Sequence, residues 1–78
     1  MNIYLVERTD GVGYDEYCGM VVIAKDDIIA RSMNPSDNST DRDAWVKIED
    51  IHTLNVTLVG KALPYAKQSV ILTDFNAG

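Results

Sequence analysis

Apolar and polar residues alternate most clearly in the segment 54–62. Leu54, Val56 and Leu58 are separated by polar residues, so they share one face of an extended chain, while Asn55 faces the other way. This period of two predicts a half-exposed strand whose leucine and valine side chains point inward.

Three further segments, 2–8, 18–25 and 69–75, have apolar residues at successive positions. A strand with this pattern presents bulky side chains on both faces, which is typical of a strand buried on both sides. The first two segments are joined by the loop 9–17, and this arrangement predicts an antiparallel hairpin with a long connection.

A short helix is predicted after the second strand. Asp26 is a suitable N-cap, because its carboxylate can accept hydrogen bonds from the unpaired amides of the first turn. Pro35 disfavours helical geometry at Asn34, which predicts the end of the helix there. The apolar stripe of this helix consists of Ile28, Ile29, Ala30 and Met33.

The remaining segments complete a single domain over residues 1–78. Residues 36–43 are expected to form a polar surface loop, and residues 48–53 a turn or short helix. Trp45, which lies between these segments, is expected to anchor the chain. The expected fold is α+β in the order β-β-α-β-β: a small four-stranded, mainly antiparallel sheet with one short helix packed on one face.

The expected sheet has more apolar surface than one short helix can cover. A helix of two turns covers one face, whereas three of the four strands carry apolar residues on both faces. The candidate apolar interface consists of Tyr4, Val6, Val21, Ile23 and Ile71. Alternatively, Trp45, Leu63 and Tyr65 close part of the second face within one chain.

The negative charge is concentrated in the first two-thirds of the chain. The net charge is −5, and residues 1–50 contain eleven of the twelve acidic residues and five of the seven basic residues. Such a surface repels phosphate backbones, so direct nucleic-acid binding is not expected. It favours a protein partner with a basic surface.

The cysteine content and the lengths of the apolar segments indicate the cellular compartment in which the protein is expected. Cys18 is the sole cysteine, so one chain can form neither a disulfide nor a cysteine-based zinc site, and it is expected to be a small core residue. The N-terminal segment has no basic n-region, and no segment approaches membrane-spanning length. These features predict a cytoplasmic protein without a membrane contact or a cofactor.

The glycine motif "GVGY" in the loop does not predict a nucleotide site. It lies between two strands rather than between a strand and a helix, and the neighbouring carboxylates would repel a phosphate. Its glycines are instead expected to supply positive φ angles to a folded loop.

The other reactive side chains do not form a recognisable catalytic pattern. Asp10, Asp15 and Glu16 lack the spacing of an EF-hand, and His52 has no second histidine with which to bind a metal. An enzyme would need a deep pocket lined by at least two of Asp10, Glu16, His52 and Tyr14. We therefore expect a protein that is not an enzyme.

The tetrapeptide "YDEY", residues 14–17, is the strongest functional signal. Tyrosine offers a large contact area at low entropic cost, and flanking carboxylates steer basic partners toward it. The candidate partner-binding residues are Asp10, Tyr14, Asp15, Glu16 and Tyr17. Alternatively, both tyrosines fold back on the sheet and the acids keep the loop soluble.

The segments "YLVERTDGVGYDEYCGMVVIAKDDIIAR" and "VILTDFNAG" resemble a family of short uncharacterised proteins encoded by tailed bacteriophages and prophages. Its members have the start "Y-L-V-x-R-T-D", then "V-G-Y-D-E-Y", and an end close to "S-F-N-A-G". Here "TDF" stands before the final "NAG", and residues 34–44 match nothing in the family pattern. The resemblance implies a bacterial host cytoplasm and an accessory phage role, without an activity.

Two functions fit these observations. The first is a phage-type accessory protein that binds a host or phage protein through the acidic loop, the exposed sheet face or both. Its most concrete form inhibits a host defence or nucleic-acid-handling complex by covering a basic surface. The second is a small homodimeric structural or assembly protein whose sheets or edge strands pair, and the molar mass in solution discriminates between the two.

Overall fold

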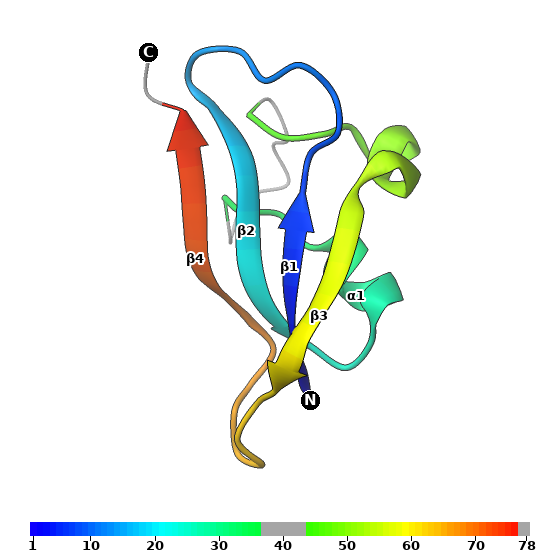
Figure 1. Cartoon of the computed structure of the whole chain (residues 1–78), viewed down its shortest axis with the longest axis vertical. Helices are drawn as coiled ribbons and strands as arrows, with labels where there is room; N and C mark the ends of the chain where they lie inside the picture. The colour runs from blue at the N-terminus through cyan, green and yellow to red at the C-terminus, as the bar shows by residue number, and fades with distance from the viewer. Residues whose placement is uncertain (37–43, 77–78) are drawn as a thin grey trace.

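The computed structural model describes residues 1–36 and 44–76. Four strands in these residues form one antiparallel sheet with the order β3-β1-β2-β4 (Figure 1). The elements are β1 (Asn2–Glu7), β2 (Glu16–Ala24), α1 (Asp27–Ser32), the 3₁₀ helix η1 (Ile48–Thr53), β3 (Asn55–Lys61) and β4 (Ser69–Asn76). This arrangement confirms the predicted α+β class, the β1–β2 hairpin and the short helix at 48–53. The surface loop predicted for 36–43 lies, from residue 37 onward, outside the described residues.

The central hairpin sets the register of the whole sheet. Val6 faces Met20 across β1 and β2, and Tyr4 faces Val22, so the even-numbered residues of both strands share one face. The edge strands each depart from regular pairing: β3 shifts its register between Ile3 and Tyr4 of β1, and β4 shifts at two places along β2. Such shifts accommodate an extra residue and twist the edge away from further pairing.

The helix α1 begins as predicted and is tied to the chain that follows it. The Asp26 carboxylate accepts a hydrogen bond from the Ile29 amide at 2.9 Å. Met33 is already extended, so the helix ends at Ser32, two residues before Asn34. At its last turn the Arg31 guanidinium donates to the carbonyl oxygens of Ile51 and Leu54. This side chain therefore fixes α1 to the end of η1.

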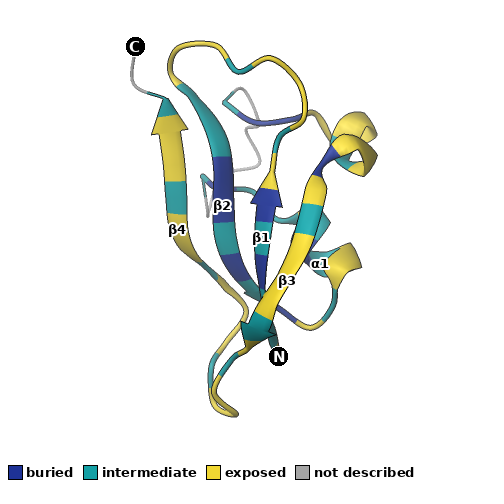
Figure 2. Cartoon of the chain, viewed as in Figure 1, coloured by how far each residue is buried: buried dark blue, intermediate teal, exposed yellow. Residues whose placement is uncertain are grey.

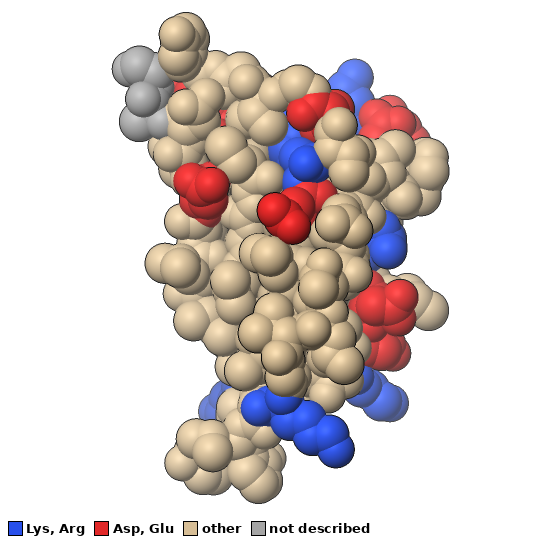
Figure 3. Space-filling model, in the orientation of Figure 1, with Lys and Arg blue, Asp and Glu red and all other residues tan. Residues whose placement is uncertain are grey.

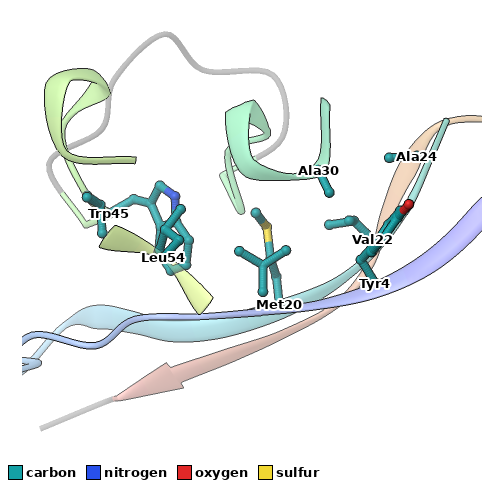
Figure 4. Packing of buried hydrophobic residues seen from close by; sticks show 9 residues of the cluster. Tyr4, Met20, Val22, Ala24, Ala30, Trp45 and Leu54 are labelled. Atoms are coloured by element: carbon teal, nitrogen blue, oxygen red, sulfur yellow. The ribbon is translucent and has the colours of Figure 1, made fainter. Parts of the chain in front are cut away.

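The core lies on one side of the sheet only. Its buried members are Tyr4, Val6, Met20, Val22, Ala24, Ala30, Trp45, Val46 and Leu54. Figure 4 shows Ala30, Trp45 and Leu54 on the side of the sheet to which Met20 and Val22 point. Trp45 thus anchors the chain as predicted, and five of the nine buried hydrophobic residues among those described lie on the two central strands (Figure 2).

Two residues of the expected apolar interface belong to this core instead. Tyr4 and Val6 are buried beneath α1 and the segment around Trp45, so the prediction that they form an accessible interface is wrong. Period-two alternation identified the face that they share, but it could not show which face the helix would cover.

The opposite face of the sheet has no cover among the described residues. Trp45 packs on the core side, while Leu63 and Tyr65 are exposed in the turn between β3 and β4. The alternative in which these three residues close the second face is therefore wrong. No helix in the described chain is both long and apolar enough to cross a membrane.

Two residues predicted to face inward are exposed. Ile28 lies on the outer side of α1, because this six-residue helix buries Ala30 and packs Ile29 and Met33 partly against the core. Leu58 lies opposite Tyr4, but it is on the edge strand β3, which has a neighbouring strand on one side only, and its side chain stays exposed. Leu54 and Val56 do face inward as predicted.

We predict that Gly19→Ala destabilises the fold, whereas Gly11→Ala does not. A Cβ atom at Gly19 would lie 2.8 Å from the Val6 carbonyl oxygen in the paired strand, so the central hairpin would have to move. Forcing extra volume into a packed site typically costs about 1–3 kcal/mol. A Cβ atom at Gly11 meets nothing within 4 Å. Urea unfolding of both variants measures the difference, and equal free energies of unfolding would contradict this account of β2.

Candidate protein-binding surfaces

The loop 8–15 between β1 and β2 is tied to the rest of the molecule at several points. The Thr9 hydroxyl donates to the Thr53 carbonyl at 2.8 Å, which connects the loop to the end of η1. The Asp15 amide donates to the Asn76 carbonyl at 2.6 Å, and the Asn76 side chain donates back to the Gly13 carbonyl at 3.1 Å. These bonds give a loop of eight residues a defined conformation between β4 and η1 (Figure 1).

The loop reverses direction at an aspartate rather than at a glycine. Asp15 has φ 59°, and the described glycines all have ordinary φ values. The prediction that Gly11 and Gly13 supply positive φ angles is therefore wrong. Aspartate enters this region more readily than most residues because its short polar side chain can bond locally.

The two tyrosines of "YDEY" have different environments. Tyr14 is 78% exposed at the turn, so its ring is available to a partner. Tyr17 packs partly against the core and contacts Phe75 edge-to-face, with ring centroids 4.8 Å apart. The backbone amide of Tyr17 also donates to the Ala44 carbonyl at 2.9 Å. Tyr14 thus fits a recognition role, and Tyr17 has a structural one.

Arg8 organises the acidic residues of the loop. Its side chain is only 6% exposed and donates through Nε and Nη2 to both carboxylate oxygens of Asp10, at 2.8 and 2.7 Å. Nη1 lies 3.6 Å from the Glu16 carboxylate, which in turn accepts a hydrogen bond from the Gly13 amide at 2.6 Å. Asp10 and Glu16 therefore hold the base of the loop, which leaves Asp15 beside Tyr14 as an exposed acid.

Arg8 was not among the residues predicted for this loop. It stands two residues before Asp10, but this spacing does not by itself predict an ion pair, because the distance between the two side chains depends on how the chain turns between them. The bidentate hydrogen bond lowers the pKa of Asp10 and raises that of Arg8.

A hollow of about 420 Å³ lies beside this ion pair. Its lining consists of Arg8, Asp10, Glu16, Trp45, Val46, Lys47 and Asp50. Asp10 and Glu16 thus come together at one hollow, which meets the number of residues expected of an enzyme pocket, whereas Tyr14 and His52 do not line it. The lowered pKa of Asp10 keeps it ionised, which does not suit a general acid.

Two donors in the lining of this hollow are closed to a ligand. Arg8 Nη1 and Trp45 Nε1 make no hydrogen bond to the described chain, but both nitrogen atoms are buried. The residues that the structure describes also contain no cluster of three or more side chains suited to hold a metal ion. The arrangement supports a structural role for the ion pair.

The uncovered sheet face forms a second candidate surface, which we call the open face. Its apolar residues are Ile3, Leu5, Val21, Ile23 and Leu72, and the exposed Val59 and Ile71 lie beside them at the register shifts of the two edge strands. Three of the five residues predicted for an interface, namely Val21, Ile23 and Ile71, therefore lie on it or at its β4 edge. Figure 3 shows an uncharged centre on this face; acidic groups with basic groups among them lie toward one end, and basic groups lie at the other.

A shallow hollow of about 210 Å³ crosses the open face between β1, β2 and β4. It is lined mainly by apolar atoms of Leu5, Val21 and Leu72, with Glu7 and Asp74 at its charged end. Cys18 also lines it and is only half-buried. The prediction that Cys18 is a core residue is wrong, because the register shift between Tyr17 and Gly19 takes it out of the regular alternation.

No family model, curated protein or solved structure matches this chain. The resemblance to short phage proteins accordingly rests on the two quoted sequence segments alone.

We predict that acid weakens the fold through Asp10. Since the pKa of Asp10 is lower in the folded protein than in the unfolded chain, its ionised form stabilises the fold at neutral pH. This stabilisation is complete above the unfolded pKa and is lost as the pH falls through the folded pKa. Asp10→Asn should therefore be less stable than the native protein at pH 7, and the two should converge in strong acid. Urea unfolding across this pH range measures it, and a difference independent of pH would contradict the assignment.

Proposed function

We propose that this protein is a non-enzymatic interaction module of the phage accessory type, which binds a basic surface on a host or phage protein through its acidic loop. The observation that carries the proposal is the exposure of Tyr14 on a loop that is tied down by the Thr9 side chain and by the backbone of Gly13 and Asp15. A fixed loop loses little conformational freedom on binding, so more of the contact energy of the ring appears as affinity.

The charges around Tyr14 favour a cationic partner. Asp15 is exposed next to the ring, and Asp10, although paired with Arg8, keeps about half of its side chain exposed. The net charge of −5 adds a long-range attraction to a basic protein surface, which raises the association rate at low salt. Basic surfaces of this kind occur on proteins that bind nucleic acid, so inhibition of a host defence or nucleic-acid-handling complex is the form of the function that we favour.

The test compares two tyrosines of equal exposure at opposite ends of the sheet. Tyr14 is 78% exposed in the loop 8–15, and Tyr65 is 80% exposed in the turn between β3 and β4. Tagged protein is expressed in its bacterial host, and the captured proteins are identified by mass spectrometry. We expect a partner whose capture falls at least about tenfold with Tyr14→Ala, as for a binding hot spot, and is unchanged with Tyr65→Ala.

A second variant separates charge from contact. Asp15→Asn retains a residue that tolerates the positive φ angle while it removes the negative charge. We expect it to slow association with the captured partner at low salt and to have a smaller effect at high salt. Equal capture by native protein and Tyr14→Ala, or equal losses with Tyr14→Ala and Tyr65→Ala, would contradict the proposed role of the loop.

A further inference from the structure

We infer that the open face binds a second copy of this chain, so that two sheets pack face to face with their strands antiparallel. The apolar centre of the face supplies the contact surface. Leu72 is 66% exposed and lies opposite Val21, and half-buried Ile3, Leu5 and Ile23 continue the surface across β1 and β2. An apolar surface that spans the strands of a sheet is typical of an interaction site rather than of scattered surface residues.

Charges at the two ends of the open face identify the occupant. Glu7 and Asp74 both lie opposite Gly19 on β2, on either side of it, so they stand at one end of the sheet. Lys25, Lys61 and Lys67 lie at the other end, where β2 and β3 finish and β4 is about to begin. Lys61 pairs with Asn2, which shares the face of the core, so its charge lies at the rim of this end. Figure 3 shows basic groups at the lysine end of this face and acidic groups, with basic groups among them, toward the other end.

This distribution makes the open face complementary to itself. A two-fold axis that lies between the sheets and runs across the strands places the acidic end of one copy over the lysine end of the other. The same operation brings the two apolar centres together, and aligned sheets of this kind pack about 10 Å apart. A uniformly basic partner would gain at Glu7 and Asp74 but would be repelled at the three lysines, so the face selects its own copy.

The dimer would leave the acidic loops accessible. Each loop 8–15 lies at the end of the sheet that carries Glu7, so the two loops of an antiparallel pair project from opposite ends. In this respect the inference adds to the proposed function, because two copies of Tyr14 could bind two sites on one large partner. The dimer itself does not depend on that function.

The first test measures the molar mass of the purified chain by light scattering over a concentration series that extends to the millimolar range. We expect a mass approaching twice 8.7 kDa as the concentration rises. Leu72→Lys should return the protein to a monomer, because it places a charge in the centre of the contact. Leu58→Lys is the matched control. Leu58 is 60% exposed, close to the 66% of Leu72, but it lies opposite Tyr4 on the other side of the sheet.

A charge exchange then tests the antiparallel arrangement. One variant carries Glu7→Lys and Asp74→Lys, so that both ends of its open face are basic. The other carries Lys25→Glu, Lys61→Glu and Lys67→Glu, so that both ends are acidic. We expect each variant alone to be monomeric and the equimolar mixture to form the dimer. All five substituted residues are exposed, and circular dichroism checks that both variants are folded.

Three results would overturn the inference. They are a monomeric native protein at the highest concentration, a dimer that Leu72→Lys and Leu58→Lys weaken equally, and separate variants that dimerise as well as their mixture. The outcome is distinguishable from that of the loop experiment, because a monomeric Leu72→Lys protein retains Tyr14. If the proposed function holds, this variant still captures the partner, with lower avidity.

Discussion

The packing of the central β1–β2 hairpin against Trp45, Leu54 and Ala30 is the contact on which the rest of the structure depends. A chain of this length can bury only a small core, and here all of the buried hydrophobic residues that the structure describes belong to one cluster on one side of the sheet. The Arg31 side chain reinforces this layer, since it joins α1 to the end of η1. One covered face implies one uncovered face, and this asymmetry provides the surface for the proposed association.

The loop 8–15 separates structural roles from recognition within a few residues. Arg8 neutralises Asp10 and approaches Glu16, and these contacts hold the base of the loop against the end of the sheet. Tyr14 and Asp15 stand beyond this base, with little cover from the chain. Charge-assisted hydrogen bonds therefore stabilise the conformation of this loop, whereas the hydrophobic core stabilises the sheet. Because the loop is held in one conformation, the exposed Tyr14 ring has a defined position.

The two proposed surfaces differ in the kind of partner that they select. The acidic loop attracts any cationic surface over a distance comparable to the Debye length, and contact with the Tyr14 ring then adds specificity. The open face carries charges of opposite sign at its two ends around an apolar centre, so it would distinguish partners by the order of their charges rather than by their sign. A small protein with both surfaces can associate with itself and still present the loop to something else.

The sequence alone determined the local elements of this protein. Period-two alternation located the strands, Asp26 marked the start of α1, and the apolar composition on both faces indicated a surface that one short helix could not cover. Only the tertiary structure decided which face is covered: it buried Tyr4 and Val6, left Val21 and Ile23 on the open face, and exposed Leu58 at an edge. Likewise, it alone placed Cys18 beside a register shift and aligned Arg8 with Asp10 across the start of the loop. The reason is physical. Alternation and capping depend on neighbours in sequence, whereas burial and strand register depend on which distant segments pack against each residue. The Arg8–Asp10 pair depends on the path of the folded loop between the two residues.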